Sequence, residues 1–262
     1  MDKNKKTPQA PQAPVKSKPK FKFPTEEVTL PSKGLIYPKD HPFSSGVIEM
    51  KYMTAKEEDI ITNQAFIQKG NVVDKLLEAL VVSDGNLDDM IIGDKNALLI
   101  ASRVLGYGKD YTFEWAGEEH TVDLSTLENV KFDESLITKG ENRFHFTTPT
   151  GQNLIEFQIM TDGLEKKVDA EVRGLKKLNK NASPTMSTRM KHMILSVDGN
   201  SDKKDIREFV DNYFLARDAK ALRDYIKEVQ PDVDFNFEIT RENGDLEEID
   251  IPIGANFFFP DA

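Results

Sequence analysis

Two hydrophobic periods alternate along this chain, and their alternation sets narrow limits on its fold. Several blocks repeat apolar residues every three or four positions, the spacing of an amphipathic helix, whereas three segments alternate apolar and polar residues at every second position. The alternating segments are residues 111–124, 144–159 and 235–251, and each contains a glycine-bearing turn. The sequence therefore predicts an α+β protein in which helical blocks alternate with three antiparallel β-hairpins.

The first strands and the first helix are predicted shortly after residue 25. Residues 28–30 are strand-like, and residues 47–53 alternate as a half-buried strand. The buried face of that second strand would comprise Ile48, Met50 and Tyr52. Thr54 and Glu57 have the spacing of a capping box, in which the hydroxyl and the carboxylate each bond a free backbone N–H at a helix start. We expect this helix to span residues 55–69.

Helical spacing recurs in later blocks of the chain. Residues 72–82 have it, and Asp94 is the expected N-cap of a helix that ends at Gly106. The inner face of that helix would consist of Ala97, Ile100, Ala101, Val104 and Leu105. A long amphipathic helix is predicted from the apolar stripe Leu164, Val168, Val172, Leu175 and Leu178. Two further helices, at residues 206–214 and 222–229, should form a helical hairpin.

Side-chain alternation also predicts the register of each hairpin, because a slip of one residue would exchange the buried and exposed faces. In the first hairpin, pairing Phe113 with Val122 and Tyr111 with Leu124 requires a two-residue loop at residues 117–118, or a four-residue loop in the same register. The second hairpin is predicted to pair Phe144 with Phe157 and Phe146 with Ile155, about a turn at residues 150–151.

The third hairpin favours a three-residue loop at residues 242–244 with a left-handed glycine. This loop pairs Phe237 with Ile249 and Phe235 with Ile251, whereas a two-residue turn would place Phe237 opposite an aspartate. The first and third hairpins share a rough aromatic pattern, which is either an internal duplication or the ordinary similarity of short aromatic hairpins.

The first 24 residues differ from the rest of the chain in composition and charge. They contain five prolines and seven lysines against a single aspartate, so they carry a charge of about +6 and are expected to be a disordered arm. Subtracting this charge from the net −10 of the chain leaves about −16 on the remainder, which argues against nucleic-acid binding by the body. We divide the rest into residues 25–160, with two hairpins, and residues 161–262, with a helical block and the third hairpin, which could form one compact unit.

The sequence lacks the residue patterns of common catalytic, metal and membrane sites. It has no cysteine, no phosphate-binding lysine loop and no metalloprotease or hydrolase motif. The four histidines, which lie in unrelated segments and are expected to be structural, are His41, His120, His145 and His192. The acidic clusters at residues 57–59 and 88–89 are expected to be solvated surfaces. Apolar runs are shorter than the roughly 20 residues of a membrane span, and no signal peptide is evident. We therefore expect a non-secreted protein with no catalytic residue, cofactor, metal or membrane contact.

Two apolar segments indicate protein contacts instead. Three consecutive phenylalanines at residues 257–259 lie where polar residues are expected. They either form a last strand in the protein's own core or anchor a partner, and strand alternation would turn Phe258 away from its two neighbours. Residues 30–38 form a rigid apolar loop that is either a clip over the core or a contact for a neighbouring subunit. The candidate protein-binding residues are Leu30, Pro31, Leu35, Tyr37, Phe257, Phe258 and Phe259.

Five blocks of the sequence are distinctive in their order and spacing. They are LPSKGLIYP, MKYMTAKEEDII, IGDKNALLIASRVLGYG, FVDNYFLARDAKALRDYIKEVQPDVD and IDIPIGANFFFPDA. In these blocks, which extend over most of residues 28–262, the chain resembles the baseplate hub assembly proteins of T-even-type contractile-tail bacteriophages and their relatives in other myophages. Some relatives carry Cys-x-x-Cys at the hairpin tips, where this chain has residues 116–119 and 241–245, so a zinc-ribbon role is absent here.

The resemblance implies a non-enzymatic viral protein that is made in the host bacterial cytoplasm and helps to build the hub of the tail baseplate. Its expected partners are other phage hub proteins, to which it would bind as an assembly factor or chaperone. Two alternatives remain: a permanent structural subunit of the hub or wedge in the virion tail baseplate, and a nucleic-acid-binding protein that uses the basic arm.

Overall fold

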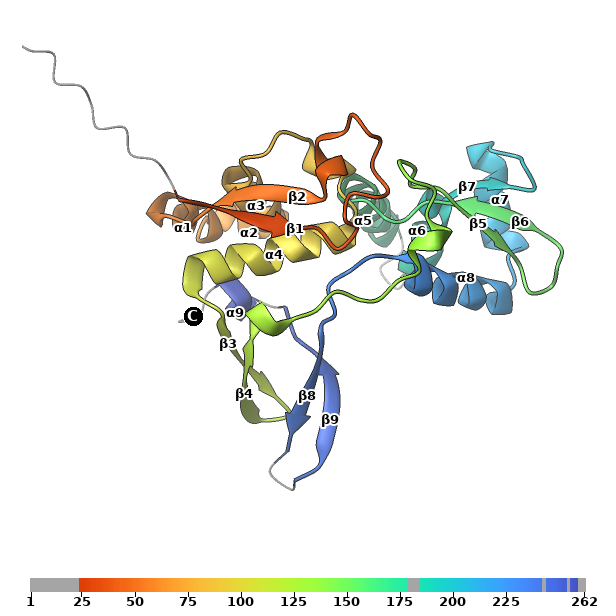
Figure 1. Cartoon of the computed structure of the whole chain (residues 1–262). Coiled ribbons are helices and arrows are strands. Elements are labelled where there is room, and N and C mark those ends of the chain that lie inside the picture. Colours follow the sequence, from red (N-terminus) through yellow and green to blue (C-terminus); the bar gives the residue numbers. More distant parts are fainter. Residues whose placement is uncertain (1–23, 179–183, 242–243, 254, 259–262) are drawn as a thin grey trace, which may run out of the picture.

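The computed structural model describes residues 24–178, 184–241, 244–253 and 255–258, and within them the α+β prediction is confirmed (Figure 1). The predicted arm lies outside the described residues, apart from Pro24. The helices are α1 (Ala55–Ile61), α2 (Gln64–Lys69), α3 (Val72–Leu80), α4 (Ile92–Tyr107), α5 (Asp162–Leu178), α6 (Thr185–Met193), α7 (Lys203–Asn212), α8 (Ala216–Val229) and α9 (Ala255–Phe258). The strands are β1 (Thr25–Thr29), β2 (Val47–Lys51), β3 (Asp110–Trp115), β4 (Glu118–Asp123), β5 (Phe144–Thr147), β6 (Leu154–Phe157), β7 (Ile194–Val197), β8 (Asn236–Thr240) and β9 (Leu246–Asp250). Four short 3₁₀ helices are η1 (Pro42–Ser45), η2 (Leu87–Asp89), η3 (Leu124–Thr126) and η4 (Glu134–Leu136).

Strands β1 and β2 form an antiparallel pair that lies over α4 (Figure 1). Ile48 and Met50 are fully buried, as the alternation predicts, but β2 ends at Lys51 and Tyr52 is exposed. Met50 also forms an isolated bridge with Val81, which ties the end of α3 to this sheet. Helix α3 in turn buries three leucines, Leu76, Leu77 and Leu80.

The predicted helix at residues 55–69 is two helices, because Asn63 ends one and starts the next. The capping box of Thr54 and Glu57 is present at the start of α1, and Glu57 is buried there rather than solvated. Asn63 has an extended backbone, and its side chain accepts hydrogen bonds from the N–H groups of Ala65 and Phe66 at 3.0 and 3.4 Å. An asparagine that caps the following turn competes with continuation of the preceding helix.

Helix α4 begins before, and ends after, the predicted limits. Its N-cap is Ile91, so the prediction that Asp94 caps it is wrong: Asp94 lies in the first turn and is completely buried. The helix continues to Tyr107, where the buried Arg103 donates to the carbonyls of Gly108 and Asp110 at 2.9 and 3.1 Å. These bonds fix the start of β3 against the helix.

The first hairpin has a different register from the predicted one. Tyr111 pairs with Val122 and Phe113 with His120, around a two-residue turn whose residues, Ala116 and Gly117, both have positive φ. Such a turn follows the twist of the two strands. The predicted register is wrong by two residues, a shift that leaves each side chain on its original face, so alternation could not distinguish the two.

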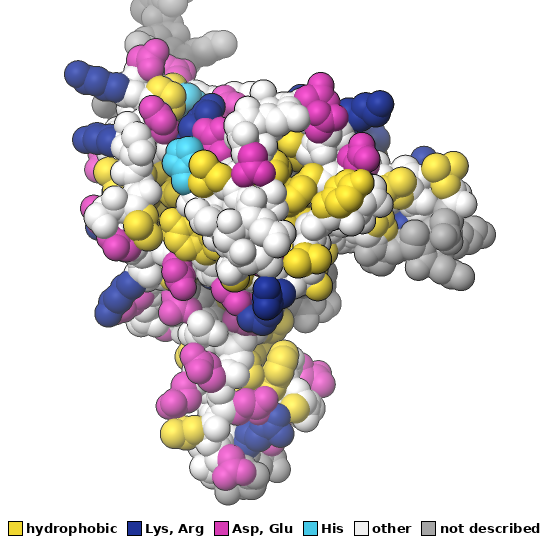
Figure 2. Space-filling view, turned by 90° about the vertical axis from the view of Figure 1, so that its right-hand side faces the viewer, with side chains coloured by type: hydrophobic (Ala, Val, Ile, Leu, Met, Phe, Trp, Pro, Cys, Tyr) yellow, Lys and Arg dark blue, Asp and Glu magenta, His cyan; other side chains and the backbone are white. Residues whose placement is uncertain are grey.

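The second and third hairpins have the predicted pairings. Phe144 is opposite Phe157 in the second, and β7 adds a third strand that the sequence did not predict. Phe237 is opposite Ile249 in the third, and Gly244 has a left-handed φ of 85°. The first and third hairpins project together from one side of the body (Figures 1 and 2).

Helices α5 to α8 and the β5–β6–β7 sheet lie together at the other end of the molecule (Figure 1). Val168 and Val172 bury the centre of the predicted α5 stripe, while Leu178 is exposed. Helices α7 and α8 follow one another in the chain, but α7 packs on α6 and β7 while Tyr225 of α8 packs on Phe146 of β5, so their main contacts are not those of the predicted helical hairpin. Since β7 pairs with β6, the division at residue 160 passes through one sheet and one continuous core.

Candidate functional site

The apolar loop at residues 30–38 is a clip over the protein's own core. Leu30 and Pro31 are buried and Leu35 is half-buried, while Tyr37 is 5% exposed. Asp94 of α4 accepts three hydrogen bonds from this loop: from the N–H of Ser32 at 2.9 Å, from its hydroxyl at 2.6 Å and from the Tyr37 hydroxyl at 2.6 Å. The loop is therefore held to the first turn of α4 by a buried polar network.

Burial dominates the electrostatics of this network. It raises the pKa of the Asp94 carboxyl to about 6, although the hydrogen bonds from Ser32 and Tyr37 favour the charged form. Burial and the adjacent Asp94 charge raise the pKa of Tyr37 well above its usual range. The Tyr37 hydroxyl also accepts the N–H of Ile91 at 3.1 Å, so one hydroxyl bonds two parts of the α4 start. This network joins the loop at residues 30–38 to α4. Its polar groups are buried and bonded to one another, so they do not offer a contact to a partner.

Phe257 and Phe258 lie in a short helix, α9, and for these two residues the prediction of a last strand is wrong. Phe257 and Phe258 are both buried, so they do not face opposite ways in the manner of a strand, while Phe259 lies outside the described residues. Phe257 makes an edge contact with Tyr111 at 5.0 Å, and the Tyr111 hydroxyl donates to the Pro252 carbonyl at 2.7 Å. This segment is packed against the first hairpin.

Phe258 contributes to the wall of an open apolar groove between α2, α3 and α4. This α2–α4 groove has a volume of about 620 Å³. Its apolar lining includes Ile67, Val72, Val73, Leu99, Ile253 and Phe258. Ile67 and Ile253 are 40% and 38% exposed, unusually high for isoleucines that border an apolar concavity. The groove therefore offers apolar surface to a partner, and it includes one of the candidate residues from the sequence.

A cluster of two lysines and three aspartates lies at the polar end of this groove. Lys95 bonds Asp74 at 2.6 Å and also bonds Asp162, while Lys166 reaches Asp162, Asp88 and Asp74 at 2.8, 2.6 and 3.2 Å. The residues come from α3, η2, α4 and α5, which the cluster holds together. The hydrogen bond from Lys95 lowers the pKa of Asp74 despite the opposing effect of burial.

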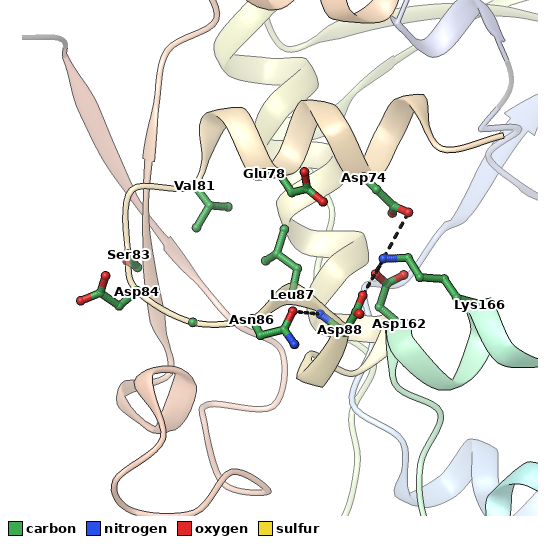
Figure 3. A pocket seen from close by; sticks show the side chains of 11 residues that line it. Asp74, Glu78, Val81, Ser83, Asp84, Asn86, Leu87, Asp88, Asp162 and Lys166 are labelled. Carbon is green, nitrogen blue, oxygen red and sulfur yellow. Dashed lines mark hydrogen bonds and ion pairs between the residues drawn. The ribbon is translucent and has the colours of Figure 1, made fainter. Parts of the chain in front are cut away.

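The same cluster borders a more polar hollow on the other side of α3, the α3–α5 pocket. Figure 3 shows Asp74 and Glu78 projecting from α3 toward Asp162 and Lys166 of α5, with the loop at residues 83–88 closing the far side. Its volume is about 480 Å³. Since its carboxylates at residues 74, 88 and 162 already pair with lysine, the pocket acts as a structural junction between helices.

Glu165 adds a partly buried carboxyl at the polar end of the α2–α4 groove. Burial raises the pKa of Glu165, and the guanidinium of Arg189 at 2.6 Å opposes that rise.

No group of three metal-ligating side chains occurs within the described ranges. No helix there is both long and apolar enough to cross a membrane.

Two of the four histidines take part in local packing and hydrogen bonding. His41 stacks on Tyr37 at 5.3 Å and caps η1, while His192 bonds Glu171 at 2.9 Å. Their partners are aromatic or acidic side chains from the same part of the fold.

Sequence periodicity did not identify Ile67 and Ile253 as site residues. Ile67 lies in a predicted helix and Ile253 follows a predicted strand, and neither position is unusual until α2 and the C-terminal segment meet α4.

A second exposed apolar region lies on the side of α7, α8 and the β5–β7 sheet, where Figure 2 shows hydrophobic side chains gathered. In or beside these elements, Leu154, Tyr213 and Leu215 are exposed.

No family model, curated protein or solved structure matches this chain.

Proposed function

We propose that this protein acts by binding other proteins during assembly of the baseplate hub of a contractile-tail bacteriophage, in the host cytoplasm. The resemblance in five sequence blocks supports the biological setting. The observation that carries the binding role is the open apolar groove between α2 and α4, whose rim residues Ile67 and Ile253 remain exposed. Exposed apolar surface of this kind is typical of protein interaction sites.

The groove favours a hub-protein segment with apolar anchor side chains flanked by basic residues. Val72, Val73 and Leu99 would receive the apolar side chains, since burial of apolar area drives such contacts. The excess negative charge of the body, about −16 outside the first 24 residues, favours a basic partner and would speed its approach. No cofactor and no covalent chemistry are needed for this role.

Substitution at the groove rim tests the proposal. The variant I67E places a charge in the apolar contact at a position that is already 40% exposed, so the fold should persist. Binding to purified baseplate hub subunits should weaken roughly tenfold or more, as expected for the loss of an apolar anchor. The matched control is L136E, because Leu136 of η4 is 42% exposed and lies outside the groove lining. Equal binding by both variants and the parent would refute the assignment of this groove.

Mass spectrometry of purified virions distinguishes the two forms of the function. An assembly factor is lost from finished particles, whereas a permanent subunit of the hub or wedge remains at fixed stoichiometry. Absence from particles together with failed hub assembly in its absence supports the chaperone. If the protein is present in particles at a fixed copy number, it is a structural subunit and the chaperone proposal is wrong.

A further inference from the structure

A second apolar groove lies along a different face of α4, beside β1. This β1–α4 groove has a volume of about 510 Å³. Its floor includes Ala97, Ile100, Ala101, Val104 and Leu105, the residues that the sequence predicts as the inner face of the helix. Ala97 and Ile100 are buried, but the other three are only half-buried. Part of a face built for burial is therefore left open.

The groove is bordered by an open strand edge. Among the described strands, β1 pairs only with β2. Tyr52 donates its N–H to the Pro24 carbonyl at 3.2 Å, and Leu30 donates to Gly46 at 2.9 Å. Because hydrogen-bonded residues alternate along an antiparallel pair, the even-numbered residues of β1 bond β2 and the odd-numbered ones present their backbone groups outward. The N–H and C=O groups of residues 25, 27 and 29 thus form a free edge for another strand.

The chain itself contains a segment that fits this edge. Residues 20–23, which precede β1 and lie outside the described residues, read Lys-Phe-Lys-Phe. In a strand, Phe21 and Phe23 would share one face and the two lysines the other. We propose that residues 20–23 of a second copy of this chain add as a strand to the edge of β1, with both phenylalanines in the β1–α4 groove. This self-association is independent of the hub-binding role.

Charge complementarity supports this occupant. Glu27 and Glu49 are directly opposite each other on the exposed face of the β1–β2 pair, and like charges in such a position repel. Lys20 and Lys22 would extend over that same face when the phenylalanines turn toward the helix. Residues 26–29 of β1 all line the groove, and Val28, whose side chain packs against the core, would contact the incoming rings.

Chain connectivity requires that the added strand come from another molecule. An antiparallel return of residues 20–23 along β1 would need a tight turn at Pro24 and Thr25. Thr25 is already extended and paired with Lys51, and proline cannot adopt the positive φ of a favoured two-residue hairpin turn. A parallel addition would need a connection of a dozen or more residues, which a segment adjoining the strand does not have. A second copy is free of both constraints.

The oligomeric state of the full chain tests the proposal. We expect sedimentation of the parent protein to show concentration-dependent association. The double variant F21S/F23S, which leaves every described residue unchanged, should weaken association roughly tenfold or more, because it removes both apolar side chains. Association should also weaken between about 0.05 M and about 0.5 M salt, since salt screens the attraction between the lysines of the arm and the exposed Glu27 and Glu49. A parent chain that stays monomeric at all accessible concentrations would overturn the proposal.

A mixing experiment separates the arm from the groove. The variant A101R blocks the floor of the groove at a half-buried helix position, and its circular dichroism and melting temperature report whether the fold is retained. F21S/F23S has an intact groove, and A101R has an intact arm, so each alone should associate much more weakly than the parent, whereas an equimolar mixture should associate more strongly than either variant alone. Should A101R misfold, the arm variant and the salt series still decide the outcome. Failure of two folded variants to associate on mixing, or undiminished association of F21S/F23S, would contradict the proposal.

Discussion

The buried carboxylate of Asp94 allows a quantitative test of how the apolar loop is held to α4. The substitution D94N keeps the side-chain size but replaces one of the two oxygen acceptors by an NH2 group, whether or not the carboxyl is protonated. The N–H and hydroxyl of Ser32 and the hydroxyl of Tyr37, which donate to Asp94 at 2.6–2.9 Å, must then share a single oxygen. A buried donor left without an acceptor costs about 1–3 kcal/mol. We expect D94N to destabilise the protein by that amount at about pH 4.5.

D94N should destabilise the protein less at neutral pH than at low pH. The raised pKa of Asp94 explains the direction of this change. Burial raises the pKa of Asp94 from 3.8 to about 6, so between these values the folded protein keeps a proton that the unfolded chain releases. Stability from this group is therefore present at low pH and lost as the pH rises through 6. By the linkage relation the loss is about 2 kcal/mol between about pH 4.5 and about pH 7.5. Asparagine does not titrate, so the difference in free energy of unfolding between the parent and D94N should narrow by that amount.

Denaturant unfolding of both proteins at the two pH values measures this change. The matched control is D133N, because Asp133 accepts the N–H and hydroxyl of Ser135 at 2.9 and 2.6 Å, the same donors that Ser32 offers to Asp94, but on the surface. The Ser135 hydrogen bonds lower the pKa of Asp133, so this group titrates below the tested range and the effect of D133N should stay nearly constant between the two pH values. A D94N penalty that grows with pH would show that the hydrogen bonds outweigh burial and would refute this account.

Three further predictions concern the arm, the end of the chain and one ion pair. Deletion of residues 1–24 should leave the melting temperature of the dilute protein nearly unchanged, because the prolines and lysines of this segment do not favour a packed structure. Substituting Phe257 or Phe258 with alanine should each destabilise the isolated protein by about 3–5 kcal/mol in denaturant unfolding, since both rings are buried. The hydrogen bonds from Arg207 lower the pKa of Glu171 from 4.5 to about 2, so their stabilisation is present at neutral pH and lost as the pH falls. E171Q should lower the melting temperature at neutral pH and reduce its further drop between about pH 5 and about pH 2.5.

Each of these expectations has a contrary result. A fall of more than a few degrees in melting temperature on deletion of the arm would show that the folded body begins before residue 25. Alanine variants of both phenylalanines with unchanged stability but impaired hub binding would make the rings docking anchors instead of core. An acid transition that E171Q leaves unaltered would assign the loss of stability to other carboxylates.

Local patterns in the sequence carried most of the secondary structure. The capping box at Thr54, the glycine of the third hairpin loop and the pairing of Phe144 with Phe157 are each defined by residues near one another in the chain. The β7 strand has no such signal, because its four residues become a strand only when β6 is available to pair with them. The two-residue error in the first hairpin arose because alternation has a period of two, while the conformation of Ala116 and Gly117 selects the register.

The sequence by itself determined the α+β class, the apolar faces and the strongly charged difference between the first 24 residues and the rest. Only the tertiary structure decided what those faces meet. Aspartate is common at helix N-caps, yet Asp94 bonds Ser32 and Tyr37, which are 62 and 57 residues away in the chain. The grooves likewise depend on elements distant in the chain, since Ile253 meets α4 only after the third hairpin has folded back. Periodicity records which side of an element is apolar, but burial depends on the neighbour that covers it, and no local pattern contains that neighbour.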